Sequence, residues 1–356
     1  MSETVSVGWS PAWRAHVAVE SAMSGMPLSL ARVVNVHKSH VDVVSVTDDG
    51  EPRADLRLKV DGALMSAYGE DYPPAVGDWL MLDDERVHAL VPRRTLITRP
   101  SAGRDSKEQL IAANVDIALV IEPFVPTFSL GRVERLAALA ESAGVEPWIV
   151  CTKTDLVDDE EISRFRGPLE AKFPHVRFVS ALDEETVADL AAEIPQGATM
   201  CVLGRSGAGK TTLINLLTGA SAAVGEVRET DAKGRHTTTH RQVFATPKFI
   251  IIDNPGVRAV GAVADVDAVD TVFPGISQLR CRFSNCSHTG EPGCAVSAAM
   301  DDGTLDPDEV ERFIRMRAEA VRNSARKSAR IARQDDRQRT RDNQAGRRAM
   351  MRNKGR

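Results

Sequence analysis

Eight consecutive residues have the types and spacing of a phosphate-binding loop, G-x-x-x-x-G-K-S/T. They are Gly204, Arg205, Ser206, Gly207, Ala208, Gly209, Lys210 and Thr211. An apolar run precedes them and a helix-like run begins at Thr212, so backbone N–H groups can bind phosphate at a helix N-terminus. We expect Lys210 to reach the β- and γ-phosphates of a nucleotide and the Thr211 hydroxyl to face Mg²⁺. The strand–loop–helix context argues against the alternative, a chance glycine-rich turn.

Two motifs upstream of this loop resemble the base-recognition motifs of GTPases. The first follows a predicted strand, resembles N-K-x-D, and consists of Thr152, Lys153, Thr154 and Asp155. In GTPases the aspartate carboxylate binds guanine, whereas adenine offers it the wrong donors and acceptors. Thr152 stands where that motif has asparagine, which weakens one base contact and leaves strict guanine selectivity open. The second motif, Ser180 and Ala181, ends another predicted strand and resembles the segment whose backbone N–H reaches the guanine oxygen.

A fourth motif, D-x-P-G, follows the phosphate loop at 253–256, directly after an isoleucine-rich strand. We expect Asp253 to hold Mg²⁺ through water and the Gly256 N–H to sense the γ-phosphate. In an ordinary GTPase the phosphate loop comes first and the base motifs come last. Here the base motifs come first, which a closed domain tolerates where its original termini are adjacent. Four motifs at strand ends in this order identify a circularly permuted GTPase.

Besides the nucleotide motifs, the sequence contains a set of potential metal ligands with the spacing C-x4-C-x-H-x5-C. They are Cys281, Cys286, His288 and Cys294. Three thiolates and one imidazole complete a tetrahedral shell, so we expect one structural Zn²⁺ per chain. A coincidence of small buried residues is the alternative. The two other cysteines, Cys151 and Cys201, lie in strand-like apolar runs and are expected to be core residues.

Composition narrows the class of protein. No apolar run reaches membrane-spanning length, no secretory signal is recognisable at Met1, and five cysteines in 356 residues argue for a reducing cytoplasm. The chain carries a net charge of −5, but residues 310–356 hold 16 Lys and Arg against 5 Asp and Glu. An acidic body with a basic C-terminal arm indicates a polyanionic partner, with a merely solvated basic helix as the alternative.

The elements that must position these residues fall into consecutive regions. Short alternating strands between Pro27 and Thr98 indicate an OB-like β-barrel, and strands alternating with helices after Ile111 indicate an α/β domain with a mostly parallel sheet. The ends of these strands carry all the nucleotide motifs. The expected regions are a flexible arm (1–26), an OB-fold barrel (27–98), a linker (99–110), a permuted GTPase domain (111–260), an α-helical zinc module (261–309) and a basic helix or tail (310–356).

Together these motifs resemble the ribosome small subunit-dependent GTPase A family. Its most specific markers here are the permuted motif order, the zinc spacing and the segment 234–239, Gly-Arg-His-Thr-Thr-Thr. The resemblance implies a cytoplasmic, monomeric GTP hydrolase of late assembly. Such a protein binds GTP and GDP, the immature 30S subunit and 16S rRNA, and the subunit stimulates its slow hydrolysis. The threonine at 152, the long basic tail and the N-terminal extension depart from the family pattern.

The D-x-P-G motif does not supply the catalytic group, because Val257 stands where small GTPases often carry a water-orienting glutamine. We expect His236 to orient or deprotonate the attacking water and Thr238 to close on Mg²⁺. Thr237 and Thr239 remain alternatives for Thr238, and a histidine that contacts rRNA or solvent remains the alternative for His236. Two other functions stay open: an ATP-dependent phosphate-loop enzyme, and a zinc-containing RNA-binding protein with nucleotide as a structural ligand.

Overall fold

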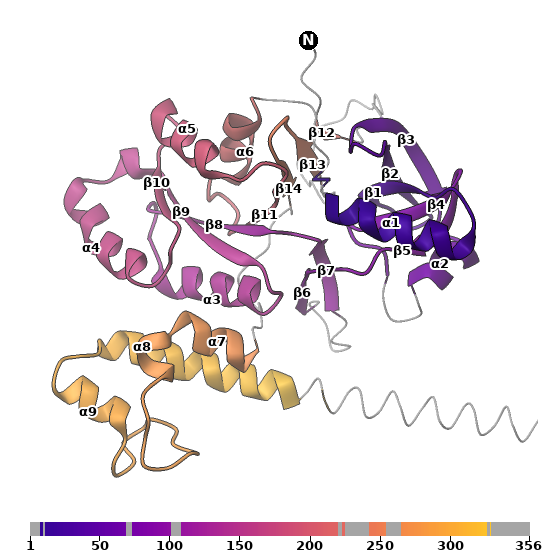
Figure 1. Cartoon of the computed structure of the whole chain (residues 1–356). Helices are drawn as coiled ribbons and strands as arrows, with labels where there is room; N and C mark the ends of the chain where they lie inside the picture. Colours follow the sequence, from indigo (N-terminus) through magenta and orange to yellow (C-terminus); the bar gives the residue numbers. More distant parts are fainter. Residues whose placement is uncertain are drawn as a thin grey trace, which may run out of the picture. The chain divides into compact units, whose positions relative to one another are not determined.

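The computed structural model describes residues 8–9, 11–68, 73–100, 108–219, 223–224, 242–253, 265–325 and 328. The chain divides into two compact units, Met1–Ala262 and Val263–Arg356. The first unit contains an antiparallel β-sheet and a larger α/β domain, and the second is built from helices (Figure 1). No helix in the part of the chain described here is long and apolar enough to cross a membrane.

The N-terminal domain is a five-stranded antiparallel sheet with the strand order β3-β2-β1-β4-β5. Alternate residues of β1 and β2, such as Val33 and Val43, face a core that helix α2 closes with Leu64. The opposite face of β1 carries Arg32, which is 2% exposed. The elements of this domain are β1 (Ser29–Val36), β2 (His40–Val46), β3 (Pro52–Lys59), α2 (Gly62–Tyr68), β4 (Trp79–Asp83) and β5 (Arg86–Leu90).

The N-terminal segment is more structured than the sequence predicts. Instead of a flexible arm through residue 26, residues Pro11–Ser24 form helix α1. Trp13 anchors this helix: it is 1% exposed, and its ring centroid lies 5.8 Å from that of Trp79. The Arg94 guanidinium lies 4.5 Å from the Trp13 ring centroid. The prediction of a flexible arm was wrong for residues 11–24. It was based on the Gly, Ser and Pro residues around them and did not consider that Trp13 could dock the helix.

A two-stranded hairpin joins the β-domain to the α/β domain. Strand β6 (Leu96–Pro100) pairs antiparallel with β7 (Glu108–Ala113). The predicted linker over 99–110 therefore overlaps two strands, and only residues 101–107 lie outside the described part. Asn114, just after β7, donates a side-chain hydrogen bond to Gly77 O at 3.0 Å. This contact joins the hairpin to the β-domain.

The α/β domain contains a seven-stranded sheet with the order β10-β9-β8-β11-β14-β13-β12. The first five strands in this order, β10, β9, β8, β11 and β14, are parallel, and β13 and β12 add an antiparallel edge. Helices α5 and α6 lie on one face and α3 on the other (Figure 1). The strands are β8 (Ile117–Pro123), β9 (Glu146–Thr152), β10 (Val176–Val179), β11 (Thr199–Leu203), β12 (Ala223–Val224), β13 (Gln242–Ala245) and β14 (Ile250–Asp253). The helices are α3 (Leu130–Glu141), the 3₁₀ turn η1 (Thr154–Leu156), α4 (Asp159–Glu170), α5 (Glu184–Glu193) and α6 (Lys210–Thr218).

Local sequence explains where these elements begin. Ser129, Asp158 and Asp183 cap α3, α4 and α5, each accepting a hydrogen bond from an N–H of the first helical turn. The parallel strands are mainly apolar because helices cover both faces, and all seven residues of β8 are buried, including Glu122, which pairs with Arg132. Because these strands are parallel, the carboxyl ends of β9, β10, β11 and β14 lie at one edge of the sheet, and the polar motifs follow there.

The second unit contains α7 (Val266–Val272), α8 (Pro274–Ser277), α9 (Ala295–Asp301) and a helix over 307–325. Val310, Phe313 and Met316 of the last helix are buried, and their spacing of three residues places them on one face. The Phe313 ring centroid lies 5.5 Å from that of Phe273. The segment from residue 310, expected to be a basic helix or tail, is helical up to residue 325 and contributes to the core of this unit up to Ala320.

Candidate nucleotide site and metal centre

The phosphate-loop residues connect β11 to α6 in the middle of the sheet. Gly204 allows the loop to pass close to β8, since a Cβ at this position would lie 2.6 Å from the carbonyl oxygen of Ile121. The loop ends at Lys210, where α6 begins. The first N–H groups of a helix have no partner within the helix, so this end can bind an anion. The geometry therefore suits phosphate, as the sequence predicts.

Lys210 folds back onto the loop that precedes it. Its ammonium donates hydrogen bonds to the carbonyl oxygens of Gly204, at 3.1 Å, and Arg205, at 2.8 Å. Burial lowers the pKa of Lys210, and the nearby Asp253 carboxylate counteracts that shift. Lys210 is thus held inside the loop, where its side chain could turn from these carbonyls to phosphate oxygens.

Thr152 lies at the carboxyl end of β9 and is 6% exposed. Its hydroxyl donates a 2.7 Å hydrogen bond to the carbonyl oxygen of Ala208 in the phosphate loop. The first base motif and the phosphate loop are therefore joined directly. From the sequence, Thr152 was predicted only as a weakened base contact, and this role was missed. Its signal was a hydrogen-bonding side chain at the end of the strand.

Asp155 and Ser180 bring the two base motifs together. The Ser180 hydroxyl donates a 2.7 Å hydrogen bond to Asp155 Oδ1, across 25 residues of sequence. Ser180 also accepts a hydrogen bond from the Leu182 N–H at 3.1 Å, which shapes the turn after β10. Asp155 itself is exposed, so its carboxylate is open to a ligand while one oxygen is already oriented.

Two exposed leucines directly follow the two base motifs. Leu156 is 57% exposed and Leu182 is 84% exposed. An apolar side chain beside polar base-recognition groups could pack against the flat face of a purine. Neither leucine was predicted as a site residue, although each directly follows a polar motif in the sequence.

Asp253 ends β14, which pairs in parallel with β11, so its carboxylate lies at the same edge as the phosphate loop. With Thr211, the second residue of α6, it offers the oxygen ligands that Mg²⁺ prefers. Three further predicted site residues, His236, Thr238 and Gly256, lie outside the described residues.

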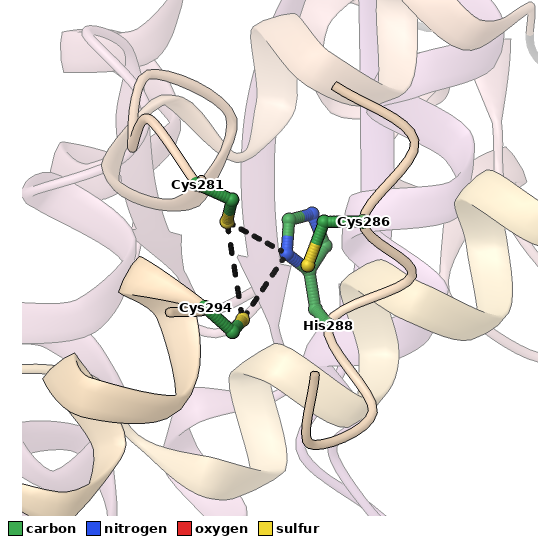
Figure 2. A group of neighbouring side chains, drawn as sticks. All are labelled: Cys281, Cys286, His288 and Cys294. Atoms are coloured by element: carbon green, nitrogen blue, oxygen red, sulfur yellow. Dashed lines mark hydrogen bonds between the residues drawn. The ribbon is translucent and has the colours of Figure 1, made fainter. Parts of the chain in front are cut away.

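In the second unit, the predicted zinc ligands Cys281, Cys286, His288 and Cys294 converge, as Figure 2 shows. Their ligand atoms all lie within 4.8 Å of one another. His288 Nδ1 lies 3.5 Å from Cys281 Sγ and 3.7 Å from Cys294 Sγ, and the two sulfurs are 3.9 Å apart. Zn–S bonds of 2.3 Å and Zn–N bonds of 2.0–2.1 Å in a tetrahedron place sulfurs about 3.8 Å apart and sulfur and nitrogen about 3.6 Å apart. The donor set therefore fits a closed tetrahedral zinc site.

A neighbouring carboxylate organises this centre. Glu291 accepts hydrogen bonds from the N–H groups of Ser287 and Thr289, at 2.7 and 2.8 Å, and so braces the turn that carries His288 at φ +61°. The Ser287 hydroxyl also donates to Glu291, and this bond first, followed by the backbone N–H bonds, lowers the Glu291 pKa to about 2, so the group stays a carboxylate. Sequence reasoning missed Glu291.

Cys294 caps α9 and accepts a hydrogen bond from the Ser297 N–H at 3.4 Å. Burial raises the pKa of its thiol, whereas hydrogen bonds from Ser297 and His288 lower it, to about 6. The thiolate is the form that binds metal, so the start of α9 prepares this ligand for zinc.

A second group of potential ligands, His37, His40 and Asp42, lies on the β1–β2 hairpin. His37 Nε2 is 2.8 Å from Asp42 Oδ2, and Arg57 Nε donates to Asp42 Oδ1 at 2.8 Å. The two imidazole rings stack with centroids 4.0 Å apart, so their in-plane lone pairs do not meet at one point. Because Arg57 already neutralises the carboxylate, this group is an ion-pair cluster rather than a metal site.

Comparisons with known proteins agree with this geometry. The family model of the RsgA GTPase matches residues 90–263. A small ribosomal subunit biogenesis GTPase RsgA from Xylella fastidiosa strain M12 is 38% identical over 89% of this chain and 96% of its own. Its counterpart from Xanthomonas campestris pv. campestris strain B100 is 35% identical over 92% of this chain and 91% of its own.

Solved structures show the same fold at lower identity. YjeQ from Thermotoga maritima superposes with a TM-score of 0.60 at 22% identity, over 83% of this chain and 99% of its own. YloQ, a circularly permuted GTPase, superposes with a TM-score of 0.58 at 20% identity, over 83% of this chain and 96% of its own. The predicted motif order, hydrolase class and α/β architecture are thereby confirmed. The chain belongs to the RsgA family of circularly permuted GTPases and is a GTP hydrolase.

Proposed function

We propose that this GTPase acts in late assembly of the small (30S) ribosomal subunit, and that the subunit stimulates its hydrolysis of GTP. The relatives named above are small ribosomal subunit biogenesis GTPases, and they align with nearly the whole chain. The likeness to these relatives supports the ribosomal part of the proposal, and the hydrogen bonds Thr152–Ala208 and Ser180–Asp155 support its nucleotide part. These bonds unite phosphate and base motifs at one sheet edge. We further propose that the protein works as a cytoplasmic monomer.

At the nucleotide site, residues 204–212 hold the phosphates, residues 152–155 with Ser180 and Ala181 hold guanine, and Gly256 senses the γ-phosphate. Mg²⁺ binds with GTP through Thr211, Thr238 and Asp253, and neutralises charge that develops on the phosphates. His236 orients or deprotonates water. One structural Zn²⁺ per chain is held by Cys281, Cys286, His288 and Cys294, because a closed set of four protein ligands leaves no open position for catalysis.

The RNA partner is 16S rRNA. The basic C-terminal segment contributes phosphate contacts, because polyanions release counterions when lysine and arginine neutralise them. The five-stranded antiparallel domain is proposed to be an OB-fold barrel, a fold that commonly binds nucleic acid.

The decisive experiment measures GTP hydrolysis by the pure protein alone and with 30S subunits, with 50S subunits and 70S ribosomes as controls. We expect a slow basal rate and strong stimulation by 30S alone. Equal rates with and without 30S would reject the proposal. ATP and XTP in competition with GTP test the alternative of an ATP-dependent enzyme, which the exposed Asp155 carboxylate disfavours.

A further inference from the structure

The loop between the first two zinc ligands exposes an aromatic ring. Phe283 lies between Cys281 and Cys286 and is 47% exposed. A single exposed apolar side chain is common on protein surfaces, so the groups around the ring decide whether it marks a contact site. The loop is not a frayed end, because metal ligands fix both of its ends and the Cys286 N–H donates to Phe283 O at 3.2 Å. The ring is therefore presented on a rigid support.

Arg282 is held beside this ring. Its guanidinium carbon lies 5.5 Å from the Phe283 ring centroid. Its backbone N–H donates to Gly293 O at 3.1 Å. Gly293 has φ +79°, and a Cβ there would lie 3.0 Å from Arg282 Cβ and 3.2 Å from Arg282 Cδ. The chain thus leaves space for the arginine side chain where any other residue would crowd it.

The loop carries positive charge. The segment 278–290 contains Arg280 and Arg282 and no aspartate or glutamate, and the carboxylate of Glu291, which follows it, bonds to Ser287 and Thr289. Both arginines are exposed, and among the described residues neither forms an ion pair with a carboxylate. Asn285, also exposed, adds an amide with both a donor and an acceptor. An aromatic ring, two unpaired guanidinium groups and an amide are the groups that bind an unstacked nucleotide.

We propose that residues 280–285, the knuckle loop, form a stacking platform for one unpaired RNA base. The Phe283 ring stacks on the base, and Arg280 and Arg282 contact the adjoining phosphates. Double-stranded RNA does not offer this ligand, because its bases are already stacked on each other. An apolar protein partner would also cover an exposed ring, but two unpaired arginines beside it favour a polyanion. The inference rests on the proposed function only for the source of the RNA, the small subunit.

The test compares binding of the zinc-loaded full chain to a fluorescein-labelled 12-nucleotide single-stranded RNA and to the same strand in a 12-base-pair duplex. Phe283→Ala and Phe283→Leu should weaken single-strand binding by about 5- to 150-fold, since stacking on one aromatic contributes that much affinity per base. Phe283→Tyr should retain it, and duplex affinity should stay unchanged in all three variants. Val321→Ala, at an apolar position 50% exposed in the same unit, is the matched control. Zinc content by elemental analysis must equal that of the wild type.

Retained single-strand binding by Phe283→Leu would indicate apolar contact without stacking and overturn the proposal. Equal losses for single strand and duplex would also overturn it. Ultraviolet cross-linking of the single strand, mapped by mass spectrometry, should attach RNA within 280–285 in the wild type, and its absence there would contradict the platform. Stimulation by 30S is measured separately, so a protein that 30S does not stimulate would reject the proposed function while leaving the RNA comparison readable.

Discussion

The Thr152 hydroxyl donates a 2.7 Å hydrogen bond to the Ala208 carbonyl, linking groups 56 residues apart. Thr152 is the last residue of β9 and the first residue of the base motif, and Ala208 lies in the phosphate loop. The bond therefore presets the distance between the subsites for the base and for the phosphates, which lowers the ordering cost of binding a nucleotide that spans both. The single hydroxyl proton is already used, so Thr152 acts on the nucleotide through the loop as well as through its place in the base motif.

Thr152→Val should weaken GTP binding by roughly 5- to 100-fold, because it leaves the Ala208 carbonyl without its buried partner at a cost of about 1–3 kcal/mol. Thr152→Ser should bind close to wild type, since it keeps the hydroxyl. Titration of a fluorescent GTP analogue measures the dissociation constants. Thr127→Val removes an exposed hydroxyl that donates to the carbonyl oxygen of its neighbour Pro126 and serves as the control. Wild-type affinity in Thr152→Val would show that the bond does not organise the site.

Asp155→Asn should shift the base preference from guanine towards xanthine, because an amide inverts one hydrogen-bonding group facing the base. The asparagine oxygen can still accept the Ser180 hydrogen bond, so the turn after β10 should persist. Competition of GTP and XTP for a fluorescent nucleotide provides the measurement. Asp159→Asn, at the start of α4, is the charge-matched control. If GTP and XTP bind equally to wild type and mutant, Asp155 does not contact the base.

The sequence predicted the parts of the site that are contiguous. The phosphate loop, the D-x-P-G aspartate and the zinc ligands each carry a fixed local spacing that their chemistry demands. Ser180 and Asp155 were predicted as members of separate motifs. Their mutual hydrogen bond could not be, because it depends on how two parallel strands align. Long-range contacts of this kind are set by the sheet register, which has no local signature.

Other features were mispredicted or missed because their signal lies in one or a few side chains. Trp13 turns a Gly- and Ser-containing segment into a docked helix. In the last helix, Val310, Phe313 and Met316 provide a buried face that the surrounding arginines conceal in a simple charge count. Glu291 was overlooked because its role, bracing the His288 turn, consists of backbone hydrogen bonds.

Cys286→Ala should release zinc and unfold the segment around 275–300, because structural zinc contributes about 10–16 kcal/mol to folding of such modules. Elemental analysis and limited proteolysis follow the two effects, with Ser284→Ala as the control in the same loop. GTP binding should survive, since the nucleotide motifs belong to the other compact unit. One zinc per chain in the mutant would show that Cys286 is not a ligand.

Removal of the basic tail should flatten the salt dependence of 30S binding. The deletion should begin at residue 329, because a cut at 310 would destroy the buried face of the helix over 307–325. Residues 329–356 carry 10 Lys and Arg against 3 Asp. Each lost phosphate contact changes the slope of log K against log salt by about 0.7–0.9. Asp335, Asp336 and Asp342 changed together to Asn give a full-length control that should not flatten the slope, and an unchanged slope in the deletion would place the tail away from rRNA.

His236→Ala should nearly abolish 30S-stimulated hydrolysis while GTP affinity stays close to wild type. Val257 occupies the position after D-x-P-G and cannot orient water, so the attacking water needs a polar partner elsewhere. A group that acts only in the transition state lowers turnover without altering ground-state binding, typically by about 10²–10⁴-fold for a general base. Single-turnover hydrolysis, measured with and without 30S, is compared with the affinities for GTP and for 30S to separate these effects. His175→Ala, directly before β10, provides a histidine control outside the nucleotide motifs. Full stimulated turnover in His236→Ala would make a ribosomal group acting in trans the catalyst, whereas collapsed GTP or 30S binding would make His236 a structural or RNA-contacting residue.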